Sequence, residues 1–535
     1  MRFTRLVVLS ALVCATAAQT QERHDHPGGA GNLGEVSFAN SGAAAAQAPF
    51  LRGLALLHSF EYGEAAEAFR EAQKADASFA MAYWGEALTY AHLLWGEDDP
   101  AAARAALARL AASPGARLAK AGTARERAYG SAIEALFVEA SPAVRTSAFA
   151  DSMRRVAAAY PDDVDATTFT ALAVMFSEYG ARRTPAQRAA LRDEAITLAE
   201  RAFLSHPQHP GSAHYLIHAT DDPAFAARGL VAARRYAAIA PDAEHALHMP
   251  SHIFLQLGLW DDVATTNERA WAASRAEIRG RGETNANLSF HALKWLQYAY
   301  LQQGRWRAAR ALVDTARAVL TGADLRNADH VDARYAIGAL EFVYAANTGE
   351  WSKAACDVMT APLAAPSGPS DRERSFNADA AAQSSFARIK CSGDTVGATS
   401  ASGVAPNTRL VVDAAAAHHR GDYARAIELL VPLAAAPQGA PTGPPTFVRL
   451  HEVLGESLLD AKRPRESVAA YERALELTPS RSASLLGLAR ARNALGDRAG
   501  AASAYRQLLA NWKNADGDLT PLRALLAEAR AGAAR

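Results

Sequence analysis

Residues 454–479 read LGESLLDAKRPRESVAAYERALELTP, and residues 486–509 read LGLARARNALGDRAGAASAYRQLL. In both stretches apolar residues recur every three or four positions, which is the spacing of one face of an α-helix. Tyr471 and Tyr505 are 34 residues apart, at matching places near the end of each stretch. The two stretches are therefore copies of one helical unit.

The same interval separates Lys462 and Gly496, which lie at the turn between two helices of each unit. A helical hairpin of this length, with small residues where the helices approach closely and Pro479 ending the second helix, is typical of the tetratricopeptide repeat. Looser copies lie upstream, each with a glycine followed two positions later by an aromatic residue: Gly258 and Trp260, Gly304 and Trp306, Gly349 and Trp351, and Gly421 and Tyr423. Glycine permits the tight turn, and the aromatic ring packs between the two helices.

Helical periodicity runs through almost the whole chain from Ala44 onwards, and strand patterns are scarce. Because each hairpin buries its apolar face only against neighbouring hairpins, such units stack into an extended superhelix with a concave surface. We therefore predict an all-α fold in which tetratricopeptide-repeat hairpins stack as an α-solenoid.

Composition divides the chain into several parts. The first has Arg2 and Arg5 ahead of a short apolar run and an A-x-A site, which is typical of a secretory signal peptide. The predicted parts are a signal peptide at 1–18, a flexible leader at 19–43, an N-terminal array with a histidine-rich centre at 44–360, a Pro/Gly/Ser-rich connection with a short helix at 361–405, and a C-terminal array at 406–535. We therefore expect an exported protein, periplasmic or extracellular, without stable membrane insertion once the signal is removed.

Charge and cysteine content exclude several classes of protein. The 56 Lys and Arg residues balance the 56 Asp and Glu residues, so nothing indicates the basic surface that nucleic acid or an anionic membrane requires. Only Cys356 and Cys391 remain after the signal peptide, which excludes a fold framed by several disulfides. Whether these two cysteines form one disulfide depends on geometry that the sequence leaves open.

Half of the 16 histidines fall between residues 205 and 306. They are His206, His209, His214, His218, His245, His248, His252 and His291. The first helices of successive hairpins stack side by side at roughly 10 Å between axes. Imidazoles near the starts of neighbouring helices can therefore converge.

The motifs around these histidines place most of them at helix starts. In HPGSAHYLIH, the Pro-Gly pair indicates a helix start, which puts His214 and His218 on one face of its first two turns. In HALHMPSHIF, the proline indicates a helix start with His252 in its opening turn and the two earlier histidines in the approach to it. Ser289 is suited to cap a further helix, which His291 opens.

A cluster of this kind suits a metal ion, because neutral imidazole is a good ligand for zinc, copper, iron and nickel. The candidate ligands are His214, His218, His245, His248, His252 and His291, with Asp221 or Asp222 as a further ligand, a partner of a ligand or a base. The positive end of a helix dipole favours the neutral imidazole. Tyr215 stands where a metalloprotease motif carries glutamate, which disfavours hydrolysis by that mechanism. Two other interpretations stay open: the histidines cap helices and fill a polar seam, or the helix N-termini bind an anion.

Three phrases carry a resemblance to a known family. They are FEYGEAAEAFREAQKADASFAMAYWGEAL, HPGSAHYLIHATDDP and HALHMPSHIFLQLGLWDDVATTNERA. They resemble a family of bacterial, often exported, tetratricopeptide-repeat proteins in which HPGxxHYxIHA and HxxHMPxHI recur. The resemblance covers roughly residues 50–310 and implies the helical fold and a shared site, but no activity. Ser78 departs from the pattern, because a tetratricopeptide unit usually has proline there.

We expect an exported scaffold that binds a protein or peptide partner on its concave face. The alternative is a metal-binding protein or metalloenzyme that uses the histidine cluster. No catalytic residue can be named, since no nucleophile elbow, P-loop or Rossmann pattern presents itself. His58 and His92 are expected to be packing residues.

Overall fold

The repeat at the C-terminal end folds as its sequence predicts. The computed structural model describes residues 31–535 apart from residues 96, 328–329, 362–370, 440 and 535, so the predicted signal peptide lies outside it. The two repeat stretches form four helices: α23 (Leu450–Asp460), α24 (Pro464–Leu477), α25 (Ser482–Leu495) and α26 (Arg498–Asn511). Both turn residues adopt left-handed backbone, with φ of 60° at Lys462 and 87° at Gly496.

Small residues let these helices approach closely. A Cβ added at Gly455 would lie 2.7 Å from the Tyr471 ring, and one at Gly487 would lie 2.2 Å from it. The tyrosine ring therefore packs between two helices at positions where any larger residue would collide with it. The prediction of small residues where the helices of this repeat approach closely is confirmed here.

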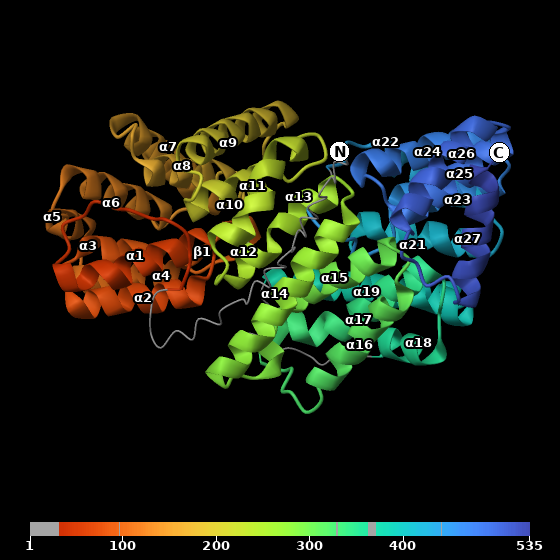
Figure 1. The fold of residues 1–535 in the computed structure, drawn as a ribbon, viewed down its shortest axis with the longest axis horizontal. Coiled ribbons are helices and arrows are strands. Elements are labelled where there is room, and N and C mark those ends of the chain that lie inside the picture. Colours follow the sequence, from red (N-terminus) through yellow and green to blue (C-terminus); the bar gives the residue numbers. More distant parts are fainter. Residues whose placement is uncertain (1–30, 96, 328–329, 362–370, 440, 535) are drawn as a thin grey trace, which may run out of the picture. The chain divides into compact units, whose positions relative to one another are not determined.

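Helices of the same kind fill the first part of the chain (Figure 1). They are α1 (Ala44–His58), α2 (Tyr62–Ala75), α3 (Ala80–Leu88), α4 (Pro100–Leu110), α5 (Pro114–Lys120), α6 (Ala124–Leu136), α7 (Pro142–Ala159), α8 (Val164–Phe176), α9 (Pro185–Ser205), α10 (Pro210–Ala219), α11 (Ala226–Ile239), α12 (Glu244–His248), α13 (Pro250–Gln256), α14 (Trp260–Arg281), α15 (Phe290–Gln302) and α16 (Trp306–Val319). Two short 3₁₀ helices, at Leu93–Trp95 and Asn285–Asn287, accompany them. Most helices pack chiefly on the helix before and the helix after them. The prediction of an all-α stack of helical hairpins is therefore confirmed for the described residues.

The single sheet among the described residues is a short antiparallel pair, in which Ala91 of β1 (Ala91–His92) faces Asp98 of β2 (Glu97–Asp98). The remaining helices are α17 (Val331–Thr348), α18 (Lys353–Thr360), α19 (Asp371–Ser392), α20 (Thr395–Ser400), α21 (Pro406–His419), α22 (Tyr423–Ala435) and α27 (Thr520–Ala533). Cys356 and Cys391 form a disulfide with 6.1 Å between their Cα atoms, which joins α18 to α19. The question that the sequence left open is thus answered by geometry.

The glycines of the looser hairpins all adopt left-handed backbone. Their φ angles are 66° at Gly258, 69° at Gly304, 78° at Gly349 and 79° at Gly421. Trp260 and Trp306 then begin the next helices, α14 and α16. The glycine marks the turn in each case, as predicted, because only this residue adopts positive φ without strain.

Repeats far apart in sequence also contact one another. The Trp260 Nε1–H donates to the Ser480 carbonyl at 3.0 Å, and the Asp516 N–H donates to the Gly304 carbonyl at 3.0 Å. The turns before α14 and α16 therefore pack against loops of the last repeats. In the part of the chain that the structure covers, no helix has the length and apolar character needed to span a bilayer.

Candidate metal centre

Four helices carry the six candidate histidines. His214 and His218 lie one turn apart on α10, and their ring centroids are 4.7 Å apart. His252 lies in the opening turn of α13, and His291 is the second residue of α15. These positions agree with the sequence prediction. Ser289 precedes α15 as expected, although its side chain makes no capping hydrogen bond.

His245 and His248 lie in the approach to the helix that Pro250 opens, as predicted, and this approach forms a short helix of its own, α12. The backbone N–H of His245 donates to the Glu61 carboxylate at 2.9 Å, which satisfies a donor that the first turn of a helix leaves free. This anchor comes from a residue 184 positions earlier, so no local pattern announces it.

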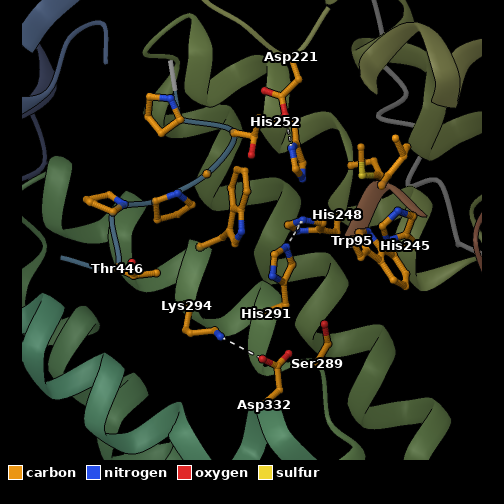
Figure 2. Close-up of a pocket in the computed structure, with 18 of the residues that line it drawn as sticks. Trp95, Asp221, His245, His248, His252, Ser289, His291, Lys294, Asp332 and Thr446 are labelled. Atoms are coloured by element: carbon orange, nitrogen blue, oxygen red, sulfur yellow. Dashed lines mark hydrogen bonds and ion pairs between the residues drawn. The ribbon is translucent and has the colours of Figure 1, made fainter. Parts of the chain in front are cut away.

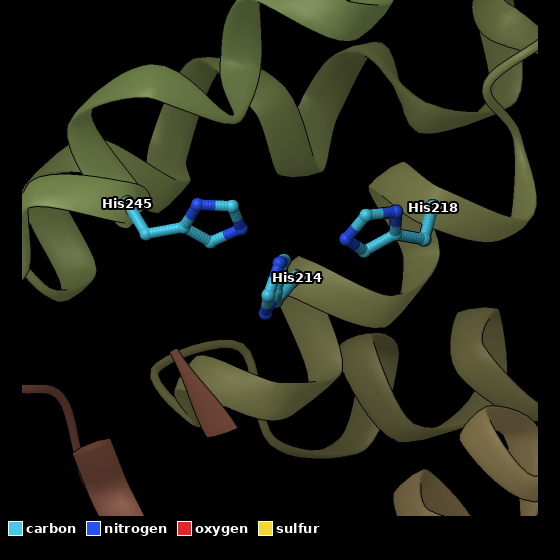
Figure 3. A group of neighbouring side chains, drawn as sticks. All are labelled: His214, His218 and His245. Atoms are coloured by element: carbon cyan, nitrogen blue, oxygen red, sulfur yellow. The ribbon is translucent and has the colours of Figure 1, made fainter. Parts of the chain in front are cut away.

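Three of the histidines converge on one point. His214, His218 and His245 each offer a ring nitrogen, and these nitrogens all lie within 4.8 Å of one another. Figure 3 shows the three rings turned toward a common space between α10 and α12. The Nε2 atom of each ring is buried and has no hydrogen-bond partner among the described residues. We call these three residues the inner group.

The protonation of the inner group follows from its surroundings. His214 Nδ1–H donates to the His58 carbonyl at 2.6 Å, which leaves Nε2 with its lone pair. Burial lowers the pKa of His214 to about 3. Burial, with the neighbouring histidines as a smaller cause, lowers the pKa of His218 and His245 well below the ordinary value. All three imidazoles are therefore neutral near pH 7, which is the form that binds metal, and burial rather than a helix dipole is the main cause.

The other three histidines form an outer group. His248, His252 and His291 also offer ring nitrogens within 4.8 Å of one another. His248 Nε2 and His291 Nε2 are 3.1 Å apart, and a dashed line in Figure 2 marks this contact. The ring centroids of His218 and His252 are 6.1 Å apart, and those of His245 and His248 are 6.2 Å apart. The inner and outer groups are therefore neighbours.

Polar residues fix two rings of the outer group. His248 Nδ1–H donates to Asn267 Oδ1 at 2.7 Å, and the Asn267 amide in turn donates to a backbone carbonyl. His252 Nδ1–H donates to Asp221 Oδ2 at 2.7 Å, and Asp221 Oδ1 accepts from Gln256 at 2.8 Å. Burial lowers the pKa of His248 to about 3. Asp222, the other predicted carboxylate, instead pairs with Arg192 at 2.8 Å and lies outside the site.

The histidines border a cavity of about 1090 Å³ (Figure 2). All three outer residues line it, and so do His218 and His245, whereas His214 does not. Trp95, Trp295 and the proline-containing segment 441–446 supply much of its wall. Two side-chain amides hold this segment in place. The Gln256 amide donates to the Pro441 carbonyl, and the Gln383 amide donates to the Thr446 carbonyl, each at 2.7 Å. The cavity is large enough for a small organic molecule beside the histidines.

Sequence reasoning missed a buried network behind the inner group. His58 and His209 both donate through Nε2–H to Asp165 Oδ1, at 2.9 and 3.3 Å, and the Tyr215 hydroxyl donates to His58 Nδ1 at 3.0 Å. Burial alone would raise the pKa of Asp165, but the hydrogen bonds from both histidines outweigh it and lower that pKa. His58 is thus part of a polar network as well as packed, and its carbonyl orients His214. No motif marks Asp165, since its partners lie 107 and 44 residues away.

Comparison with known proteins supports the repeat but leaves the site unassigned. The tetratricopeptide repeat family model matches residues 448–481, which span α23 and α24. No curated protein matches this chain significantly.

Solved structures with similar helical arrays include yeast Tom70, at 10% identity over 91% of this chain and 96% of that chain, with a TM-score of 0.34. The Cut9 and Hcn1 hetero-tetramer of APC/C is 11% identical over 91% of this chain and 77% of that chain, with a TM-score of 0.37. At these identities and TM-scores, the likeness says nothing about ligands or partners.

Proposed function

We propose that this protein binds a transition-metal ion through the inner group, His214, His218 and His245. The observation that carries the proposal is the burial of three Nε2 atoms, none with a partner among the described residues, around one point. Leaving a buried polar nitrogen unpaired costs about 1–3 kcal/mol, and one cation satisfies three such nitrogens together. Three imidazole ligands suit zinc, copper, iron or nickel and leave a fourth position for water or another ligand.

The surroundings of the inner group support this proposal. A histidine that binds metal usually donates its other ring N–H to a carbonyl or carboxylate, and His214 does so to the His58 carbonyl. The buried network of His58, Asp165 and His209 holds that carbonyl in place. Simple packing would explain the burial of these rings, but it would not leave three ring nitrogens facing one another without donors.

The proposal is tested by metal content and thermal stability of the untagged protein. The double variant His214→Ala, His218→Ala should lose metal that the wild type retains after gel filtration. His206→Ala, His419→Ala is a matched control, because both of its histidines are exposed and lie outside the two groups. Metal at 100 times its dissociation constant for the inner group should stabilise the wild type by about 2.7 kcal/mol through that site, and the double variant should lose this contribution. Equal metal content in wild type and double variant would refute the proposal.

A second proposal is that the repeats bind a protein or peptide partner on a concave surface. Its support is the tetratricopeptide match, since such arrays commonly serve as interaction scaffolds. The array also holds a non-helical segment of its own chain, residues 441–446, through side-chain hydrogen bonds to carbonyls. A scaffold should bind its partner equally well before and after chelation, whereas binding that requires the metal centre should fail once the metal is removed.

We also propose that the protein is exported. The disulfide between Cys356 and Cys391 supports this, because structural disulfides persist in oxidising compartments and are rare in the cytosol. Fractionation of the producing cells tests it, with mass spectrometry of the mature N-terminus. Export predicts removal of about the first 18 residues, and an intact N-terminus in the cytosolic fraction would contradict it.

A further inference from the structure

We propose that the centre holds two metal ions, with the outer group, His248, His252 and His291, binding the second ion beside the first. This inference rests on the proposed function, because it takes the inner group as the first site. It adds a second ligand set and the position of both ions relative to the cavity.

One ion can bind only those ring nitrogens that lie close to one another. Ligand nitrogens about 2.0–2.1 Å from a tetrahedral ion are only about 3.3 Å from one another. Within each group the ring nitrogens lie within 4.8 Å of one another, so small side-chain movements bring three of them to one ion. Between the groups, the neighbouring ring centroids are 6.1 and 6.2 Å apart. Six imidazoles in this arrangement form two sets of three.

Hydrogen bonds fix the orientation of two rings of the outer group. His248 and His252 each have Nδ1–H committed to an oxygen acceptor, Asn267 Oδ1 and Asp221 Oδ2, both at 2.7 Å. Their Nε2 atoms therefore carry lone pairs. The bond from His252 to a carboxylate is the arrangement that commonly fixes a metal-binding histidine and strengthens it as a ligand.

Two ring nitrogens of the outer group approach each other closely. His248 Nε2 and His291 Nε2 are 3.1 Å apart, so one proton must lie between them. Because His248 has its own proton on Nδ1, this shared proton belongs to His291. A metal ion that replaces it would bind His248 Nε2 and, after a change of tautomer, His291. His291 is exposed and lines the cavity.

The cavity indicates what the paired ions would bind. All three outer histidines and two of the inner histidines line it, so both ions would border the same space. Two neighbouring ions commonly clamp one ligand through oxygen atoms. The exchangeable ligand would be a small oxygen donor, such as hydroxide or a carboxylate, that enters from the cavity.

Zinc stoichiometry of full-length, untagged protein tests the inference. The protein is stripped with a chelator, reloaded with Zn²⁺, freed of excess zinc by gel filtration, and analysed for zinc and protein. We expect two zinc ions per chain in the wild type and one in His291→Ala. We also expect one in His218→Ala, none in the double variant His218→Ala, His291→Ala, and two in the control His206→Ala.

The outcomes separate the two proposals. One zinc ion per chain in the wild type, or two in His291→Ala, would refute the proposal that the outer group binds a second ion. No zinc in the wild type would refute the inner site and the inference with it. The wild-type stoichiometry decides the question even if a variant fails to fold, which circular dichroism would reveal. Loading with Cu²⁺ tests proximity, since adjacent ions should give a magnetically coupled electron paramagnetic resonance spectrum, and two isolated spins would overturn the shared centre.

Discussion

Asp221 and Asp222 are adjacent in sequence but have different surroundings. Asp221 accepts hydrogen bonds from His252 and Gln256, whereas Asp222 pairs with Arg192. The sequence offered both carboxylates as candidates, because a periodic pattern places a residue near a helix end without saying which way its side chain points. The histidines were easier to predict, since proline and glycine fix the starts of α10 and α13.

The difference between the two aspartates gives a prediction at the scale of single residues. Asp221→Asn weakens the acceptor of His252 Nδ1–H, so metal affinity of the outer group should fall by roughly 10- to 100-fold. Asp222→Asn should leave that affinity unchanged. Competitive titration of Zn²⁺ against a chromophoric chelator measures both. A loss of affinity in Asp222→Asn that equals the loss in Asp221→Asn would contradict the assignment.

At the scale of elements, the helical hairpin depends on small residues at helix crossings. Gly487 of α25 faces the Tyr471 ring, where an added Cβ would lie 2.2 Å away, whereas an added Cβ at Gly338 of α17 meets nothing within 4 Å. Both glycines lie inside helices, so the low intrinsic helix propensity of glycine destabilises both helices to the same extent. The sequence revealed the 34-residue period from such positions, but it could not show which upstream glycines are tightly packed.

These two glycines form a matched pair of substitutions. Gly487→Ala should lower the free energy of unfolding by about 1–3 kcal/mol, because the methyl group forces α25 away from Tyr471. Gly338→Ala should raise it by up to about 1 kcal/mol, because alanine favours the helix and the space is open. Urea denaturation measures both. A stabilising Gly487→Ala would show that the close crossing is absent.

A cluster of carboxylates between α2 and α14 should make the stability of the fold depend on pH. Burial, then the nearby Glu64, raises the pKa of Glu277 from 4.5 to about 7, despite the opposing charge of Arg281. A carboxyl with a raised pKa contributes stability that is complete below pH 4.5 and is lost as the pH rises through 7. Its side chain is 38% exposed, so solvent screening limits the effect to the order of 1 kcal/mol.

Glu277→Gln tests this dependence, since glutamine resembles the protonated acid. The variant should be more stable than the wild type at pH 8 and equally stable at pH 4. Thermal denaturation at both values provides the comparison, and the measurement at pH 4 is its internal control. A variant that is less stable than the wild type at pH 8 would contradict the raised pKa.

At the scale of the whole molecule, the last repeats contact the central helices through a buried ion pair. Arg481 forms two hydrogen bonds with the Glu452 carboxylate, at 2.7 and 2.9 Å, and donates to the Tyr298 hydroxyl of α15 at 2.9 Å. Tyr298 and Arg481 are 183 residues apart, so a sequence pattern that repeats every 34 residues cannot predict their contact. The fold class follows from local periodicity, whereas the packing of distant repeats depends on such single pairs.

Removing one partner of this ion pair should lower the stability of the fold. Arg481→Met leaves the Glu452 carboxylate buried without its cation, and we expect a loss of about 3–5 kcal/mol in the free energy of unfolding. Arg463→Met is the control, because its ion pair with Glu466 is exposed and should contribute less than about 1 kcal/mol. The double variant Arg481→Met, Glu452→Met should recover much of the loss. Equal effects of Arg481→Met and Arg463→Met in chemical denaturation would contradict the buried role of the pair.

The same whole-molecule packing places α1 and α8 against α10, which carries His214 and His218 of the inner group. The most direct measurement is an anomalous difference map from crystals of zinc-loaded protein, with data collected above and below the zinc absorption edge. The account predicts a peak about 2 Å from the Nε2 atoms of His214, His218 and His245. Fully loaded crystals without a peak there, with those three nitrogens bonded to water or protein instead, would contradict it.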